Sequence, residues 1–336
     1  MYKLIDGFHP NWETTQLEQQ IIKNYTKDKQ FDLVVNQTWG FIETVNPVTK
    51  KKQNKFEITK DLVEKGLVKN ILFYNFVDPI YDLSTWYEVF DHCKKFINAD
   101  DIATLGQIDS DKIKLNVPFQ YWAVFVADHF KHYLDIDTIP KNFDHLFLCY
   151  NRKPTWHRVE LYKAFKKNNL LNKGVFTLGN EDPEQVKLVN ADEKTIPLSN
   201  EDDHGQMGIA NDTMTLGNIN LWNSHFVTIV NETQHISKLG YPFLSEKMWK
   251  PIIGMRPFLC LGDHGTINLL QDAGFYTFND MFDLAKKDLG VNDIVYAIKN
   301  CKFDLASMYK EIQWKLHHNK KRFFEFAKEQ KQIFDL

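Results

Sequence analysis

Cysteine and long hydrophobic runs are both scarce in this chain. It holds four cysteines among 336 residues, far apart and with no CxxC pair. Cys149 and Cys260 stand in apolar runs typical of buried strands, so we expect reduced, structural thiols and no disulfide framework. No run approaches the roughly 18 apolar residues of a membrane-spanning helix, and the first residues hold no apolar segment of signal-peptide length. These absences predict a soluble, cytoplasmic protein without a transmembrane segment.

An excess of charge of one sign is also missing. The chain has 41 basic and 44 acidic residues and a formal net charge of −3, which gives no overall electrostatic case for binding a nucleic-acid backbone. The most basic stretch, residues 44–57, predicts a solvated loop, with a nucleic-acid contact as the alternative. We therefore do not expect nucleic acid as a partner.

The usual sequence motifs for phosphate loops and metal ions are absent as well. No GxxxxGK[ST] sequence occurs, and none of the twelve histidines stands in an HExxH or similar ligand pattern. The first absence excludes a P-loop. The second predicts that the protein holds no metal, and we expect no resident cofactor either.

The first part of the chain alternates strand and helix patterns. With 43% hydrophobic and 14% aromatic residues the chain can bury a large core, and its length favours two domains. Apolar segments at 31–39 and 70–78 predict strands, and residues 58–67 between them predict a helix. From 83 to 134 the pattern is mostly helical. Pro140 then marks a domain boundary.

After Pro140 the alternation of strands and helices is clearer and predicts an α/β fold. The predicted strands are 143–151, 174–180, 225–232 and 256–262, and the predicted helices are 156–169, a short one after Ser245, 266–273, 279–289, 292–299 and 305–334. We therefore expect two α/β domains, 1–140 and 141–303. The amphipathic segment 304–336 is expected to pack back on the body of the protein, with a membrane surface as the alternative.

Two of these helices begin with a charge of the wrong sign. Ser245 is a good N-cap and Glu246 suits the positive end of its helix, but Lys247 in the first turn opposes the helix dipole. In the helix after strand 143–151, a capping box would place Glu or Gln where the chain has Arg158. Both helices follow strands, at the edge where open α/β sheets bind ligands, so the two cations predict a diphosphate site. The alternative is that they pair with acids such as Glu160 or Glu246.

A family resemblance gives this site a ligand. The segments IVNET, FLSEK and RPFLCLG resemble the donor-binding signature of α-1,3-fucosyltransferases and related nucleotide-sugar enzymes of the GT-B fold. That signature is a Phe-Glu-Asn-Ser strand end, a Tyr-x-Thr-Glu-Lys helix start and a strand with Pro-Val and Gly. Upstream, HRVELYKAF resembles the segment in which an Arg opens a helix and grips the donor diphosphate. The likeness covers residues 143–273 and implies two Rossmann-like domains that face a cleft.

The resemblance also implies roles for single residues. Lys247 and Arg158 would hold the diphosphate of a nucleoside-diphosphate sugar, and Glu246 would accept hydrogen bonds from the ribose hydroxyls. Phe243 takes the place of the family's tyrosine and would stack on the base. Pro251 departs from the family pattern, because a proline inside a helix removes a hydrogen bond and should kink or shorten it.

The catalytic groups are less well defined. Asn231 and Glu232 stand in the reverse of the family's order, so a role against the sugar can fall on either. Sugar transfer also needs a base for the acceptor hydroxyl, beside the cations that stabilise the departing diphosphate. Asp78 at the end of strand 70–78 is one candidate, and His9 and Asp6 in the turn IDGFHP are others. For each of the three, a role as a turn or capping residue is the favoured interpretation, because Asp is common in turns.

The resulting prediction is a glycosyltransferase. It would move a sugar from a nucleoside-diphosphate donor, GDP-linked if it is fucosyltransferase-like, to a hydroxyl acceptor such as a glycan, with inversion and without a metal. A non-catalytic sugar-binding or nucleotide-binding protein of the same fold is one alternative, motivated by the swapped Asn231 and Glu232. A transferase that glycosylates DNA bases is another, and its only support is the basic stretch 50–55.

Overall fold

The fold is described from a computed structural model of the chain, which divides into two compact units. The first unit is Met1–Val124 with Lys328–Leu336, and the second is Phe125–Ala327. This division falls earlier than Pro140 and places most of the C-terminal helix in the second unit. The residues that the structure describes are 3–5, 19–20, 22–24, 27, 32–36, 43–46, 49–68, 71–74, 103–105, 115–117, 120–134, 142–151, 154–178, 216, 219–233, 235, 242, 244–285, 287–302 and 304–332.

A parallel sheet runs through the first unit. Its strands are β1 (Lys3–Ile5), β2 (Leu33–Asn36), β5 (Ile71–Tyr74), β6 (Ala103–Leu105) and β7 (Leu115–Val117). They lie side by side in the order β1-β2-β5-β6-β7, and every neighbouring pair is parallel. Leu33, Val34 and Val35 are fully buried, as is usual for the inner strands of a parallel sheet. The strands predicted at 31–39 and 70–78 are confirmed.

The basic stretch expected to be a loop forms a hairpin that leads into a helix. β3 (Glu43–Val45) and β4 (Lys52–Asn54) pair antiparallel, and α2 (Lys55–Glu64) follows directly. The prediction for residues 44–57 is wrong because these short, largely exposed strands carry no apolar alternation that would reveal them. Lys55 is fully buried, so it contributes nothing to an exposed basic patch.

The second unit is a mixed α/β structure built on a four-stranded parallel sheet. Its strands are β8 (His145–Cys149), β9 (Gly174–Phe176), β10 (His225–Asn231) and β11 (Phe258–Leu261). They lie in the order β11-β10-β8-β9. All seven residues of β10 are buried, as expected for an inner strand with helices on both faces of its sheet. The four strands predicted in this half of the chain are confirmed.

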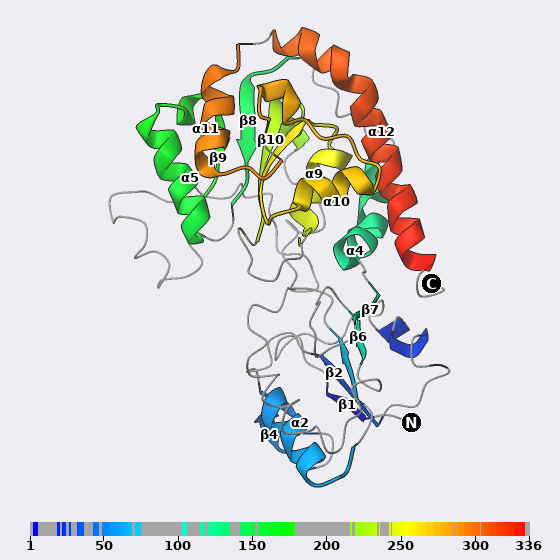
Figure 1. The fold of residues 1–336 in the computed structure, drawn as a ribbon. Coiled ribbons are helices and arrows are strands. Elements are labelled where there is room, and N and C mark those ends of the chain that lie inside the picture. Colours follow the sequence, from blue (N-terminus) through cyan, green and yellow to red (C-terminus); the bar gives the residue numbers. More distant parts are fainter. Residues whose placement is uncertain are drawn as a thin grey trace. The chain divides into compact units, whose positions relative to one another are not determined.

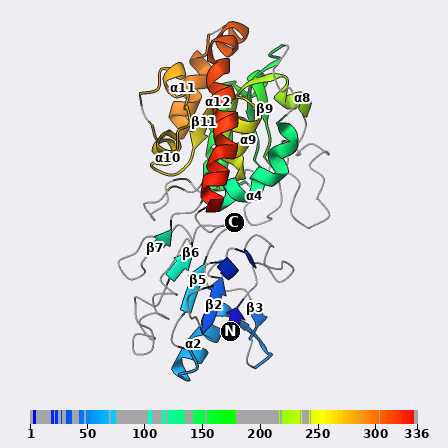
Figure 2. The same ribbon diagram turned by 90° about the vertical axis from the view of Figure 1, so that its right-hand side faces the viewer.

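Helices cover both faces of this sheet. The helices after the first unit's sheet are α4 (Tyr121–Phe130), α5 (Trp156–Lys167), α8 (Ile219–Trp222), α9 (Glu246–Ile253), α10 (Thr266–Asp272), α11 (Val291–Asn300) and α12 (Leu305–Gln332), with short 3-10 helices η1 (Lys131–Tyr133), η2 (Leu171–Lys173) and η3 (Asp280–Phe282). In Figure 1, α5 and α11 lie on one side of the sheet and α9 and α10 on the other. Figure 2 shows α12 running along the second unit, and its residues Phe323 and Phe326 contact Trp249 of α9.

In the described part of the range 83–134, expected to be mostly helical, α4 and η1 make up the larger share, and the sequence missed the short strands β6 and β7. One helical prediction needs correction. The helix expected at 279–289 is reduced to η3, because Asp283 takes a left-handed conformation with φ of 56° and ends the turn. The other predicted helices are confirmed, including the long C-terminal one.

The C-terminal end of α9 is fixed by buried contacts. Met255, with φ of 54°, donates its N–H to the Ile252 carbonyl at 3.3 Å. Arg256 donates its N–H to the Pro251 carbonyl at 2.8 Å, which completes a Schellman motif. The guanidinium of Arg256 is fully buried over the Tyr309 ring and donates to the Met255 carbonyl at 2.8 Å. A cation suits this negative helix end, so α9 is anchored although it contains a proline and has only eight residues.

Candidate functional site

The strand order reverses at one point in the sheet of the second unit. β8 and β10 are neighbours, but the chain proceeds from β8 to β9 on one side and from β10 to β11 on the other. Helices α5 and α9, which follow β8 and β10, therefore lie on opposite faces of the sheet (Figure 1). In open α/β sheets the carboxyl ends of two such strands border the crevice in which ligands bind. The site is therefore built around Asn151 after β8 and Asn231 at the end of β10.

The first turn of α5 contributes two buried basic side chains, which donate hydrogen bonds to backbone carbonyls at the end of β10. Arg158 Nη2 donates to the carbonyls of Asn231 at 3.2 Å and Glu232 at 3.3 Å. His157 Nε2 donates to the same Glu232 carbonyl at 3.0 Å. Burial, with the Arg158 charge and His235 as smaller causes, lowers the pKa of His157 to about 4. At neutral pH this imidazole is therefore uncharged and acts as a hydrogen-bond donor, while Arg158 supplies the positive charge.

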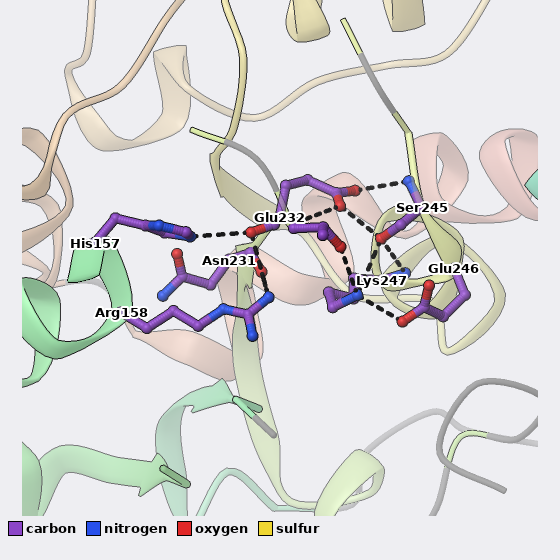
Figure 3. A network of polar contacts seen from close by, with 8 residues as sticks. His157, Arg158, Asn231, Glu232, Ser245, Glu246 and Lys247 are labelled. Carbon is purple, nitrogen blue, oxygen red and sulfur yellow. Dashed lines mark hydrogen bonds and ion pairs between the residues drawn. The ribbon is translucent and has the colours of Figure 1, made fainter. Parts of the chain in front are cut away.

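The carboxylate of Glu232 is fully buried and holds the N-terminus of α9 (Figure 3). It accepts hydrogen bonds from Ser245 N at 3.1 Å, Ser245 Oγ at 2.5 Å and Thr233 N at 3.2 Å. Burial raises the pKa of Glu232, while Lys247 and the bond from Ser245 oppose that rise. Glu232 therefore ties the end of β10 to the cap of α9, and its backbone and side chain together connect both helix starts.

Lys247 and Glu246 form an ion pair that is joined to the same hydrogen-bond network. Lys247 Nζ lies 2.6 Å from Glu246 Oε1 and also donates to Thr233 Oγ1 at 3.2 Å and Ser245 Oγ at 3.3 Å. The Lys247 side chain is 25% exposed and that of Glu246 9%. Burial would raise the pKa of Glu246, but the charge of Lys247 and its hydrogen bond prevail and lower it. Of the two acid pairings considered for the cations, the one with Glu246 is present, whereas Glu160 pairs with Lys163 instead.

Two buried amides at the switch point have unused hydrogen-bonding capacity. Asn231 is 1% exposed, and neither its Oδ1 nor its Nδ2 has a hydrogen-bond partner among the residues that the structure describes. Asn151 is fully buried and its Nδ2 donates to the Thr177 carbonyl, but its Oδ1 likewise has no partner within that described part. Figure 3 shows the Asn231 side chain on the side of the network where His157 and Arg158 lie. Buried polar groups are normally paired, so these amides suit a site that a polar ligand completes.

An exposed aromatic side chain stands beside the network and was missed in the sequence. Trp156, the first residue of α5, is 55% exposed, and its ring lies 5.9 Å from that of His157 and 6.1 Å from that of His235. His235 in turn lies 3.0 Å, through Nδ1, from the carbonyl of Gly262 after β11. The sequence does contain an indication of this role. Trp156 is a large aromatic residue at the first position of a helix and does not belong to the apolar positions that face the core. Its position makes it a platform for a flat ligand group.

Six of the predicted site residues come together in the structure. They are Arg158, Asn231, Glu232, Ser245, Glu246 and Lys247 (Figure 3). The predicted stacking residue Phe243 and the candidate bases Asp78, His9 and Asp6 lie outside the described residues. Their assignments stay predictions.

Comparisons with known proteins give this site no relative. A scan against protein-family models finds no match, and neither the search of curated proteins nor that of solved structures finds one. Within the described ranges, no helix is both long and apolar enough to cross a membrane, and no three His, Cys, Asp or Glu side chains gather as metal ligands.

Proposed function

We propose that the chain is a glycosyltransferase that binds a nucleoside-diphosphate sugar at the β8–β10 switch point. The observation that carries the proposal is the meeting of two helix N-termini, each with a cation in its first turn, around Glu232. Lys247 contacts the Ser245 hydroxyl that Glu232 holds, and Arg158 contacts the Glu232 carbonyl. Helix N-termini and cations both favour an anion, and two phosphates would use both.

The two cations differ in how they would act on the diphosphate. Lys247 is partly exposed and can exchange Glu246 for a phosphate oxygen, which frees the Glu246 carboxylate for ribose hydroxyls. Arg158 is 3% exposed and occupied by two carbonyls, so it contributes mainly its charge and the fixed position of α5. Trp156 provides an aromatic face for the base, beside or in place of Phe243. Oδ1 of Asn151 and the whole side-chain amide of Asn231, which have no hydrogen-bond partner in the described part of the chain, would complete the polar contacts.

The proposed reaction is a direct displacement at the anomeric carbon. The acceptor oxygen forms a bond to that carbon while the bond to the diphosphate oxygen breaks, and the acceptor proton passes to a base. Lys247 and Arg158 stabilise the charge on the departing diphosphate. The base would come from the first unit, where Asp78, His9 and Asp6 are the candidates, in a GT-B-like pair of domains. Each unit contains a parallel sheet, as the proposal requires of both domains.

Thermal stabilisation by sugar nucleotides tests the proposed donor site. A ligand that binds only the folded state raises its melting temperature. We expect one member of a GDP-, UDP-, CMP- and dTDP-sugar panel to stabilise the wild type and to lose most of that effect in Lys247→Ala and Arg158→Ala. Lys163→Ala, which removes an exposed cation from α5, is the matched control and should behave as wild type. Equal stabilisation of all four proteins would place the donor elsewhere.

Product analysis then tests the transfer itself. The stabilising donor is incubated with a panel of glycan acceptors, and the anomeric configuration of the product is read by NMR. Inversion is the expected outcome, and retention would overturn the direct displacement.

A non-catalytic sugar-nucleotide binding protein is the second candidate. The hydrogen bonds of the Glu232 carboxylate favour it. This carboxylate accepts hydrogen bonds from Ser245 and Thr233, so it serves to hold the start of α9 and not to act on a sugar. A protein that binds the donor but releases no nucleoside diphosphate with any acceptor would support this second candidate over the first.

A further inference from the structure

A polar cavity lies away from the switch point, beside α10 and α12. Its volume is about 390 Å³, within the range of about 300–1,000 Å³ usual for small-molecule sites. It is lined by α10, by the segment from Phe275 to Lys287 and by Lys315 of α12. Nothing in the proposed transfer reaction uses this cavity.

Exposed aromatic rings stand at this cavity. Tyr276 lines it and is 37% exposed, and the ring of Trp314, 57% exposed, meets the Tyr276 ring edge-on at 5.0 Å. Lys315 Nζ lies 5.8 Å from the centre of each ring, and the part of each ring that stays exposed offers apolar surface to a ligand. The C–H faces of sugar rings pack on such surfaces while their hydroxyls remain free for hydrogen bonds.

Hydrogen bonds from α12 hold the segment that carries Tyr276. Asn319, 1% exposed, accepts a hydrogen bond from Tyr276 N and donates one to Tyr276 O, both at 2.8 Å. Arg322 Nε donates to the Ala273 carbonyl at 2.7 Å, and His318 Nε2 to the Gly274 carbonyl at 2.9 Å. These bonds fix the segment that carries Tyr276, so a ligand that stacks there need not order it first.

The polar lining suits a neutral, hydroxyl-rich ligand better than an anion. Amide, hydroxyl and carboxylate groups of Gln271, Thr277 and Asp280 line the cavity. Lys287 Nζ is 2.6 Å from Asn268 Oδ1, and Lys315 Nζ lies 5.8 Å from the centre of the Tyr276 ring. The lysines are thus placed among acceptors and rings rather than converging on an anion.

We propose that this cavity and the Tyr276–Trp314 pair form a saccharide-binding site separate from the switch point. It would anchor a neutral oligosaccharide, with a ring on the aromatic pair and hydroxyls in the cavity. The inference rests on the cavity and the aromatic pair alone. In a glycosyltransferase the site would hold part of a glycan away from the point of transfer.

Saturation-transfer NMR and calorimetry test the saccharide site directly. The probes are cellotetraose, maltotetraose, tri-N-acetylchitotriose and lactose, with inorganic phosphate and pyrophosphate as the anion arm. We expect at least one saccharide to bind, with affinity reduced about tenfold or more in Trp314→Ala and Tyr276→Ala and retained in Tyr276→Phe, which keeps the ring.

Tyr296→Ala removes another exposed aromatic, outside the cavity lining, and should leave binding unchanged. Failure of every saccharide, binding of the anions alone, or undiminished binding in both alanine variants would each overturn the proposal. If the two sites are separate, the sugar nucleotide raises the melting temperature of the Trp314 and Tyr276 variants as much as that of the wild type. A failure of the saccharide site can thus be told apart from a failure of the donor site.

Discussion

The two parallel sheets differ in the order of their strands, and that difference separates scaffold from site. In the first unit the described strands follow one another across the sheet in chain order. In the second unit the order reverses between β8 and β10, so the following helices leave to opposite faces of the sheet. A ligand crevice is expected only where such a reversal occurs. Both units thus contain a parallel sheet, and the reversal is the reason to expect the proposed ligand site in the second one.

Buried polar residues follow the same division. In the second unit a group of them meets at the reversal and links two helix starts, as Figure 3 shows for the network around Glu232. In the first unit, two buried polar residues make hydrogen bonds within local structure. Asn46 donates to Gln53 across the hairpin at 2.8 Å, and Thr59 donates to the Lys55 carbonyl within α2 at 2.7 Å. A buried polar side chain is therefore informative mainly when it links separate elements.

Removing a buried polar group should cost most at the reversal. Glu232→Ala leaves Ser245 and Thr233 donors unsatisfied, and we expect it to lower the free energy of unfolding by about 3 kcal/mol in a urea titration. Glu232→Gln keeps the shape and should cost clearly less, because burial already raises the pKa of this carboxyl. Thr59→Val in α2 should cost only about 1 kcal/mol. If Glu232→Ala and Thr59→Val lowered the free energy of unfolding equally, the proposed difference between the buried polar residues of the two units would be wrong.

Stability should also depend on pH through His157. Its pKa is lowered to about 4 in the folded protein, mainly by burial, against an ordinary value of 6.5. Between pH 6.5 and 4 this histidine is therefore protonated in the unfolded chain but not in the folded protein. The free energy of unfolding consequently falls as the pH falls through this range. We expect a loss of about 3 kcal/mol by pH 4, measured as the difference in unfolding free energy between wild type and His157→Gln at each pH. Parallel pH profiles for the two proteins would show that His157 is not the group involved.

Trp156 should matter for binding and not for folding. Because its ring is mostly exposed, Trp156→Ala should change unfolding free energy by less than about 0.5 kcal/mol. Nucleotide affinity, measured by calorimetry, should fall about tenfold if the base stacks on the indole. Trp156→Phe is the control that keeps an aromatic face. An unchanged affinity in Trp156→Ala would leave base stacking to Phe243.

The sequence revealed those parts of the fold that depend on continuous apolar runs. β10 and β11 are buried throughout and β8 is buried over its last three residues, and their apolar runs predicted all three strands. The three-residue strands β6 and β7 are too short to show a period, and β4 is polar and partly exposed. Such strands are defined by the neighbours with which they pair, and a single sequence does not show those neighbours.

The site was predictable only where it disturbs a local rule. Arg158 and Lys247 stood out because a cation in the first turn opposes the helix dipole. The bonds from Ser245 to Glu232 span 13 positions along the chain and arise from the way β10 and α9 pack, which no local pattern shows. The orphaned amide of Asn231 is likewise visible only once its surroundings are in place.

Calorimetric titration of nucleoside diphosphates into wild type and Lys247→Ala tests the central claim most directly. Lys247 is partly exposed, so its loss should lower the free energy of unfolding by only about 1 kcal/mol and leave the fold intact. The account predicts that one of GDP, UDP, CDP and dTDP binds the wild type and the Lys163→Ala control equally, and binds Lys247→Ala at least about tenfold more weakly. Absence of binding by all four, or equal affinity for all three proteins, would contradict a diphosphate site at the strand reversal.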